Sequence, residues 1–308
     1  MLQKNYLLNL LRLYLFIGFL MGCATQASKL ATPKGFPAFL QEGHRGTRGL
    51  MPENTAPAMR KALDVGANVL EIDVHISHDK QVVVAHDPYI NRNFSLLPNG
   101  QEIPKEDAQK YLLFQMNYEE IRKFDVGTKI YPAYAKQQKM AAYIPLLSEL
   151  IDSVEQYTKT KKLTKPIYNI EIKSHPEYDG TYQPAPAELV KLVMTEVTRK
   201  KIDNRFYVQS FDIRQLQEMR RQYPHVVLGF LTNDKSNFNE NIAKIGFKPH
   251  IYSPQYKIAT PELVQQCHAA GIKIIPWTVN TLEEIRVLKA MQVDGIITDY
   301  PDLFSSLL

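Results

Sequence analysis

The stretch GHRGTRGLMPENTAPAMRKALDVGANVLEIDVHISHDKQVVVAHD, residues 43–87, decides how this chain folds. Its periodicity predicts a helix over 54–66 and an apolar strand over 68–77. Asn54 is the expected cap at the start of that helix. A further strand over 39–43 leads into the stretch, and the order strand, helix, strand is the unit of a parallel sheet.

The strand over 68–77 carries two carboxylates. Glu71 and Asp73 are two positions apart, so both side chains point to the same face of the strand. His75 shares that face, but its place near the end of the strand predicts a surface residue. A short turn then forces an antiparallel hairpin with a return strand over 81–85, because a parallel crossover needs a longer connection.

This hairpin brings His86 back beside the two carboxylates. A fold about Asp79 pairs positions whose numbers sum to about 158. An odd sum places His86 on the face of Glu71 and Asp73, whereas a shift of one residue turns it away. We therefore expect a hairpin register with an odd sum.

Strands and helices alternate from residue 39 to the end of the chain. With the return strand set aside, the expected strands are 39–43, 68–77, 167–173, 206–210, 226–231, 250–252, 272–278 and 295–298. The expected helices are 54–66, 146–157, 185–200, 213–223, 237–246, 261–270, 282–291 and a short 302–308. Eight strands with helices between them predict an α/β fold, a (β/α)₈ TIM barrel.

Residues 88–143 interrupt this alternation as an insertion after the hairpin. The segment holds six tyrosines and several prolines, and it is too long for a simple loop. It is either a structural cap or a cover over the substrate, and we favour the cover. The barrel domain, with this insertion, is expected to span 36–308.

The N-terminus has the pattern of a targeting segment. Lys4 and Arg12 precede an apolar run that is shorter than the about 20 residues of a membrane span, which indicates a signal peptide over 1–22. Cys23 directly follows that run. We expect an exported lipoprotein, anchored to the bacterial membrane through lipidated Cys23 and a tether over 23–35, and facing the periplasm or the cell surface.

The alternative is an ordinary signal peptide with an incidental cysteine. The other cysteine, Cys267, lies on an expected helix, where a small buried apolar role suits it. Removal of the leader with Lys4 and Arg12 reduces the formal net charge from +5 to +3, because both residues are cationic. Charge this small and this dispersed argues against a nucleic-acid partner.

Polar residues collect where the barrel strands end, which is where barrel enzymes have their active sites. They are His44, Arg45, Glu71, Asp73, Glu171, Lys173, Gln209, Ser210, Trp277 and Asp299. Three carboxylates at one mouth repel one another unless a cation lies among them. Oxygen-only ligands suit a hard divalent ion, Mg²⁺ or Ca²⁺, so Glu71, Asp73 and Glu171 are the candidate metal ligands.

The remaining polar groups suit phosphoryl chemistry. His44 and His86 are candidates for general acid–base catalysis near neutral pH. Arg45 offers a planar fork for a phosphate, and Lys173 offers a point charge. Trp277 is a candidate substrate contact. Together these residues predict a metal-dependent phosphodiesterase site.

The same residues resemble the glycerophosphodiester phosphodiesterase family. The resemblance runs through HRG at 44–46, PENT at 52–55, EIDV at 71–74, Ser77, Asp79, HD at 86–87, IPLL at 144–147, IEIK at 170–173, WTVN at 277–280 and DGIITDYP at 294–301. It implies a barrel that hydrolyses small-molecule glycerophosphodiesters to an alcohol and sn-glycerol 3-phosphate with a divalent cation. By match to the motifs, His44 is the implied proton acceptor, His86 the donor and Arg45 a phosphate contact.

Two departures from the family pattern concern the turn and the substrate. Lys80 stands where the family commonly has glycine, and the segment after Asp87 keeps little of the usual pattern. Two other functions remain as alternatives: a lysophospholipase D with the same chemistry on lysophospholipids, and a non-catalytic surface protein that binds phosphodiesters or a partner. The attacking group is either water or the neighbouring glycerol hydroxyl, through a cyclic phosphate.

Overall fold

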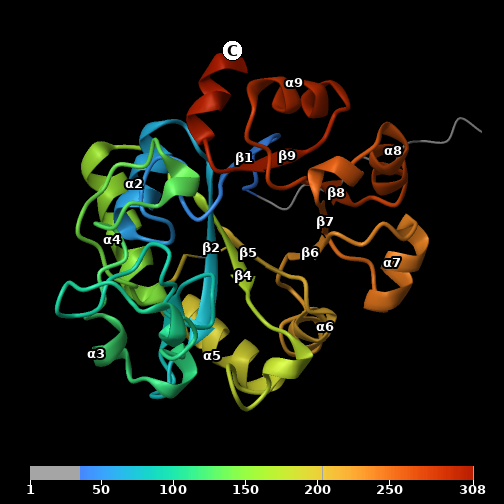
Figure 1. Ribbon diagram of the computed structural model, residues 1–308. Coiled ribbons are helices and arrows are strands. Elements are labelled where there is room, and N and C mark those ends of the chain that lie inside the picture. The colour runs from blue at the N-terminus through green and yellow to red at the C-terminus, as the bar shows by residue number, and fades with distance from the viewer. Residues whose placement is uncertain (1–34, 203, 308) are drawn as a thin grey trace, which may run out of the picture.

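Eight parallel strands form a nearly closed barrel, the class that the sequence predicts (Figure 1). The computed structural model describes residues 35–202 and 204–307. In the order β8-β7-β6-β5-β4-β2-β1-β9, neighbouring strands are hydrogen-bonded. The strands are β1 Leu40–Gly43, β2 Val69–Ile76, β4 Ile167–Ile172, β5 Phe206–Ser210, β6 Leu228–Thr232, β7 Ile251–Pro254, β8 Lys273–Ile274 and β9 Gly295–Thr298. The signal peptide, Cys23 and most of the expected tether lie outside the described residues.

The gap between β8 and β9 is closed by backbone hydrogen bonds without a regular ladder. Ile297 N donates to Pro276 O at 3.0 Å, and Val279 N donates to Ile297 O at 3.0 Å. Strand β8 is therefore much shorter than the predicted 272–278. Pro276 has no backbone N–H to contribute to a ladder, which explains part of this difference.

Helices surround the strands, as the alternation predicts (Figure 1). They are α2 Ala56–Asp64, α4 Leu147–Lys161, α5 Pro186–Arg199, α6 Ile213–Gln222, α7 Phe238–Ile245, α8 Pro261–Ala269 and α9 Leu282–Ala290. The insertion holds a further helix, α3 Tyr118–Ile121, which the sequence did not predict. Short 3₁₀ helices are η1 Lys105–Asp107, η2 Leu113–Gln115, η3 Pro132–Tyr134, η4 Pro176–Tyr178, η5 Tyr256–Ile258 and η6 Pro301–Leu307, the last where a short helix was expected.

The predicted cap of α2 was wrong by one residue. Thr55 has extended backbone angles, and its side-chain oxygen accepts from Ala58 N, so Thr55 is the N-cap. Asn54 instead has a φ of +57°, in the left-handed region. An asparagine tolerates that region because its short polar side chain bonds locally. Its side chain is thereby free to contact the mouth of the barrel.

The apolar core has an outer and an inner part. On β2, Ile72 and Val74 are buried outward against the helices around the sheet. At the base of the barrel interior, Leu40 and Val69 pack with Ile251. Each fully buried side chain of this size contributes about 1.5–3 kcal/mol. This apolar base leaves only the upper interior for the polar residues of β2 and β4.

The hairpin of β2 and β3, Val82–Val84, differs from the predicted register. Val74 pairs with Val84, so the sum is 158 and even. A regular continuation would place His86 opposite Ile72, away from the carboxylates. The ladder ends at Val84 and the chain bends at 86–88, and that bend directs His86 into the mouth. The contact was predicted for the wrong geometric reason.

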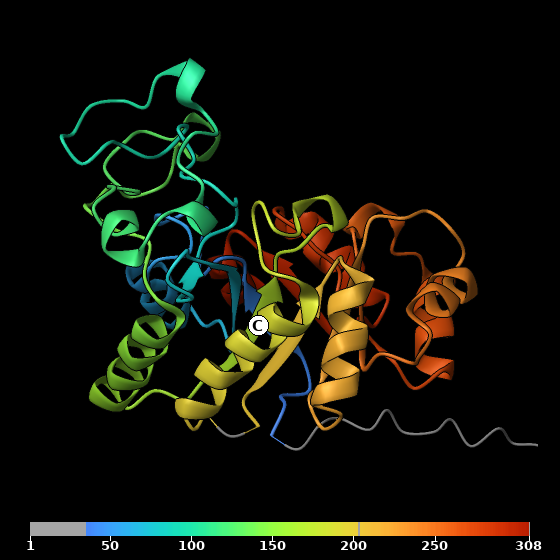
Figure 2. The same ribbon diagram turned by 90° about the horizontal axis from the view of Figure 1, so that it is seen from below.

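The insertion over 88–143 stands at one end of the molecule, whereas the described chain begins at the other end, beside the base cluster (Figure 2). Its apolar residues, among them Ile90, Ile103 and Leu113, form a cluster with Val83 of β3. This small core of its own explains how a segment without regular periodicity stays folded. Across the described ranges, no helix combines the length and the apolar character that a membrane crossing requires.

Candidate active site

Parallel registers place the candidate metal ligands at one level of the mouth. Asp73 of β2 pairs with Glu171 of β4, and Glu171 pairs with Gln209 of β5. Side chains of paired residues point to the same face of a sheet. Since this face is the barrel interior, residues from strands about a hundred positions apart meet in one place.

The three carboxylates form a tight cluster that fits a hard cation. Glu71, Asp73 and Glu171 each offer an oxygen, and these oxygens lie within 4.8 Å of one another. Among the described residues, two buried oxygens of the set, Glu71 Oε1 and Asp73 Oδ1, have no hydrogen-bond partner. Burial, followed by repulsion from Asp73 and Glu171, raises the pKa of Glu71 well above its usual value. A divalent ion would relieve that repulsion and satisfy both oxygens.

Two cations lie beside this cluster. Lys173 Nζ is 2.8 Å from Glu171 Oε1 and 3.7 Å from Asp73 Oδ1. Arg45 Nε is 3.2 Å from Asp73 Oδ2, and its Nη1 donates to Glu53 at 2.7 Å. Burial opposes ionisation of Asp73, but the charges of Arg45 and Lys173 outweigh it and lower the pKa of Asp73.

Asn54 holds Asp73 in place, a role that the sequence did not reveal. Its Nδ2 donates to Asp73 Oδ2 at 2.8 Å, and Asp73 N donates to Asn54 Oδ1 at 3.3 Å. This pair of bonds explains why the residue before the cap takes a left-handed backbone. Its place within the PENT segment was visible, but a helix cap was the simpler interpretation.

His44 lies opposite this cluster, at the end of β1. Its Nδ1 is 2.6 Å from Asp299 Oδ1, and its Nε2 is 4.0 Å from Glu71 Oε2. Burial opposes ionisation of Asp299, but attraction to His44 and their hydrogen bond lower the pKa of Asp299 to about 2. An ionised carboxylate only accepts, so Nδ1 carries the proton and Nε2 presents a lone pair to the mouth.

Burial lowers the pKa of His44 itself, and the neighbouring Arg45 charge lowers it further. Asp299 acts in the opposite direction. A histidine that is neutral at neutral pH with a free Nε2 can accept a proton. Asp299 was recognised from the sequence as a mouth residue, but its bond to His44 was not.

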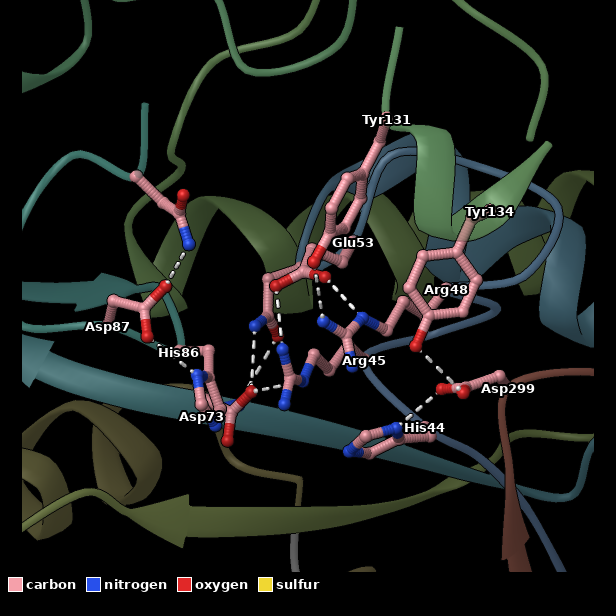
Figure 3. Close-up of polar contacts among 12 residues, drawn as sticks. His44, Arg45, Arg48, Glu53, Asp73, His86, Asp87, Tyr131, Tyr134 and Asp299 are labelled. Carbon is pink, nitrogen blue, oxygen red and sulfur yellow. Dashed lines mark hydrogen bonds and ion pairs between the residues drawn. The ribbon is translucent and has the colours of Figure 1, made fainter. Parts of the chain in front are cut away.

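His86 faces the same cavity from the other side, and it has a carboxylate of its own (Figure 3). His86 Nδ1 lies 2.9 Å from Asp87 Oδ1, and Asn91 Nδ2 donates to Asp87 Oδ2 at 2.6 Å. Burial opposes ionisation of Asp87, but the hydrogen bond from His86 lowers the pKa of Asp87 to about 2. Each mouth histidine is therefore oriented by an aspartate.

His75 is not the surface residue that the sequence predicts. It is 2% exposed, and its Nε2 lies 3.0 Å from the backbone oxygen of His86. Burial lowers its pKa to about 4, so the ring is neutral and donates to that carbonyl. The insertion covers this end of β2, which no local pattern in the strand could indicate.

Aromatic residues form the remaining wall of the mouth. Trp277 and Phe211 line a cavity of about 200 Å³ together with both histidines, Arg45, Glu171 and Lys173. The two rings meet edge to face with centroids 5.2 Å apart. Phe211, which sequence reasoning missed, follows β5 and is 38% exposed. Cys267 is remote from the mouth in the fold, buried in a helix–sheet cluster as expected.

Comparisons with known proteins agree on one family. The model of the glycerophosphoryl diester phosphodiesterase family matches residues 44–303. Relatives named glycerophosphodiester phosphodiesterase include a Bacillus altitudinis protein, 31% identical over 84% of this chain and 94% of its own. One from Caldanaerobacter subterraneus subsp. tengcongensis is 29% identical over 86% and 96%. A crystal structure from Silicibacter pomeroyi DSS-3 that bears the same family name has a TM-score of 0.76 and 31% identity, with 88% of this chain and 95% of that chain covered.

Proposed function

This chain belongs to the glycerophosphoryl diester phosphodiesterase family and is a phosphodiesterase of small-molecule glycerophosphodiesters; from this premise we propose how its mouth performs the reaction. The enzyme hydrolyses the diester to an alcohol and sn-glycerol 3-phosphate. His44 and His86 act as general base and general acid beside a divalent cation. The observation that supports this most strongly is the pair of aspartate-held histidines on either side of one carboxylate cluster.

The proton transfers follow from the two hydrogen-bond pairs. His44 Nε2 takes the proton of the attacking oxygen, which is that of water or of the neighbouring glycerol hydroxyl. Asp299 stabilises the imidazolium that forms. His86 donates a proton to the leaving alkoxide. Positioned acid–base groups of this kind contribute about 10²–10⁴-fold each.

Glu71, Asp73 and Glu171 would hold the cation, Mg²⁺ or Ca²⁺. When bound, it supplies charge stabilisation to the phosphoryl oxygens. Lys173 and Arg45 lie at the rim of the same cluster and would bind the phosphate oxygens. Trp277 would form the wall of the cavity beside the glycerol end of the substrate.

We further propose that lipidated Cys23 anchors the protein to the bacterial membrane. The described chain begins at the base of the barrel, where Phe36 packs, and the insertion stands at the opposite end (Figure 2). A tether over 23–35 reaches at most about 45 Å when fully extended. An anchor attached at the end opposite the insertion suits water-soluble glycerophosphodiesters better than embedded lysophospholipids.

The function is tested by a substrate panel on the purified full chain in detergent. Glycerophosphocholine, glycerophosphoethanolamine and lysophosphatidylcholine are each incubated with Mg²⁺, Ca²⁺ or EDTA. We expect sn-glycerol 3-phosphate from the two glycerophosphodiesters with a cation and none with EDTA. In Glu171→Gln, which keeps the size of the side chain and removes its charge, we expect at least about a hundredfold lower turnover.

Other results of the same panel contradict the proposal. Turnover of lysophosphatidylcholine alone identifies a lysophospholipase D. Undiminished turnover in EDTA removes the cation from the mechanism. Absence of turnover with all three substrates and both cations favours a non-catalytic surface binding protein.

A further inference from the structure

The carboxylate of Asp299 has a hydrogen-bond partner that does not belong to the barrel. Asp299 is 2% exposed, and its Oδ1 accepts from His44. Its Oδ2 accepts from Asn280 Nδ2 at 2.7 Å and from Tyr134 OH at 3.1 Å. Asn280 lies between β8 and β9, but Tyr134 belongs to the insertion. Figure 3 shows Tyr134, Asp299 and His44 in one line of contacts.

Tyr134 is held firmly enough to act on its neighbours. It ends η3, and the Arg48 guanidinium lies 4.6 Å from its ring centroid. The ring of Tyr131 packs beside it, with centroids 5.3 Å apart. These contacts attach Tyr134 to the loop after β1, which is the loop that begins with His44.

Three hydrogen bonds to backbone oxygens of the loop after β1 reinforce this attachment. Gln137 Nε2 donates to Arg48 O at 2.9 Å and to Met51 O at 2.8 Å, and Gln138 N donates to Leu50 O at 2.7 Å. Residues 131–138 are therefore fastened to residues 48–51 by several independent bonds. Because this segment is held in place, the hydroxyl of Tyr134 stays within hydrogen-bond distance of Asp299.

We propose that Tyr134 of the insertion is a positioning residue for His44, acting through Asp299. This inference rests on the function proposed above, in which His44 is the general base. With both Oδ2 donors in place, the carboxylate cannot rotate, and Oδ1 stays directed at His44 Nδ1. That bond selects the tautomer and the ring orientation that leave Nε2 directed at the mouth.

The charge on Asp299 supports the same role. Burial, followed by the charge of Asp299, raises the pKa of Tyr134, so the phenol keeps its proton and donates. The residue never needs to touch the substrate. The insertion would thus contribute to catalysis by completing the support of a barrel residue, besides any cover that it provides.

The test compares two phenol-to-benzene replacements in the same segment. Tyr134→Phe removes the donor to Asp299. Tyr131→Phe is the matched control, because its hydroxyl only accepts from Arg48 Nη2 at 3.4 Å. We expect Tyr134→Phe to lower kcat about tenfold with KM within twofold, since a hydrogen bond to a charged group is lost. Tyr131→Phe should change kcat less than twofold.

Two further readouts separate positioning from simple loss of structure. In an Asp299→Asn background, Tyr134→Phe should have almost no effect on kcat, because both changes act on one bond network. In proton NMR, the far-downfield ring N–H of His44, assigned by its loss in His44→Gln, should shift in Tyr134→Phe and stay unchanged in Tyr131→Phe.

The outcomes distinguish this inference from the function on which it rests. An unchanged kcat and an unshifted His44 resonance in Tyr134→Phe, with an active wild type, overturn the inference alone. If Tyr134→Phe lowers kcat by the same factor in the Asp299→Asn background as in the wild type, the inference is also overturned. A wild type without turnover overturns the proposed function, and the NMR shift then still reports whether Tyr134 controls the bond between His44 and Asp299.

Discussion

At the scale of single residues, each mouth histidine depends on a carboxylate for its orientation. His44 bonds to Asp299 at 2.6 Å, and His86 bonds to Asp87 at 2.9 Å. A fixed Nδ1 proton leaves Nε2 as the working atom of each ring. In the proposed mechanism, His44 is the base and His86 the acid because the two rings face the cavity from opposite sides.

Another carboxylate, which contacts neither histidine, lies deeper in the barrel, below the mouth. Glu42 of β1 is fully buried, and its oxygens accept from Tyr207 OH at 2.7 and 2.8 Å and from Asn169 Nδ2 at 2.9 Å. Burial raises its pKa from 4.5 to about 7, although these hydrogen bonds act in the opposite direction. The folded protein therefore holds this proton more tightly than the unfolded chain.

This shift predicts a stability effect with a definite sign. Below pH 4.5, Glu42 is protonated in both the folded and the unfolded state, so its burial does not lower the free energy of unfolding. Above pH 4.5 the unfolded chain releases this proton more easily, and the free energy of unfolding falls until the pH exceeds about 7. A shift of this size corresponds to about 3 kcal/mol at high pH. Glu42→Gln imitates the protonated form, so its unfolding free energy relative to wild type should rise by about 3 kcal/mol between pH 4.5 and 8.5 in urea titrations.

Glu155 provides a contrast of opposite sign. Partial burial opposes its ionisation, but hydrogen bonds from Arg205, Tyr168 and Lys165 lower its pKa. Its contribution is present above the unfolded pKa and is lost as the pH falls, so Glu155→Gln should destabilise the protein more at pH 8.5 than at pH 3. A Glu42→Gln difference that does not change with pH would show that the pKa of Glu42 is the same in the folded and unfolded states.

Individual site residues differed in how far the sequence could reveal them. Glu71, Asp73 and Glu171 could be predicted from the sequence, because strand periodicity and the position of active sites in barrels place them at one mouth. The bond between His44 and Asp299 joins residues 255 positions apart, and its angle depends on the loops after two strands. No local pattern contains that information.

At the scale of elements, the hairpin of β2 and β3 shows where sequence reasoning ends. The turn and both strands were predicted, because two strands joined by a short link can pair only as an antiparallel hairpin. The register was predicted with an odd sum but is even. The bend after Val84 determines where His86 points, and it depends on the packing of the insertion, which has no periodicity to interpret.

The hairpin also carries a prediction about His75. His75→Phe keeps an aromatic ring of similar volume and removes the donor to the backbone oxygen of His86. We expect kcat to fall about tenfold with little change in KM, and unfolding free energy to fall by about 1–3 kcal/mol, since a buried carbonyl loses its partner. Steady-state kinetics and urea titration measure the two effects.

His78 supplies the control on the same hairpin. It lies in the exposed turn, and its Nδ1 contacts Asn117 Oδ1 at 3.2 Å. His78→Ala should leave kcat unchanged and alter stability by less than about 0.5 kcal/mol. If His75→Phe retained full activity, the hydrogen bond to His86 would have no part in orienting the acid.

The insertion is the element about which the sequence said least. A cap and a substrate cover were both considered, and the described contacts add a third role, since Tyr131 and Tyr134 both contact Arg48 at the mouth. Prolines and tyrosines without a helix or strand period reveal neither an apolar cluster nor a contact with Asp299. Those features depend on the barrel against which the segment folds.

At the scale of the whole molecule, the barrel was predictable because its signal is repeated. Eight strands alternate with helices, and errors of a few residues at the ends of elements do not change the class. The shared mouth follows from parallel strands, whose C-terminal ends meet on one side. The closure between β8 and β9 was less predictable, since it uses single hydrogen bonds instead of a regular ladder.

The central claim is that this mouth divides acid and base work between His86 and His44. A comparison of leaving groups tests it most directly. Turnover of glycerophosphocholine, whose alkoxide must be protonated, is measured beside the p-nitrophenyl ester of glycerol 3-phosphate, whose phenolate leaves without a proton. Wild type, His44→Ala and His86→Ala are assayed with a saturating cation.

His86→Ala should lower turnover of glycerophosphocholine about a thousandfold and that of the aryl ester less than about tenfold, whereas His44→Ala should lower both by about 10²–10³-fold. Equal losses on the two substrates in His86→Ala, or the selective loss in His44→Ala instead, would contradict the assignment.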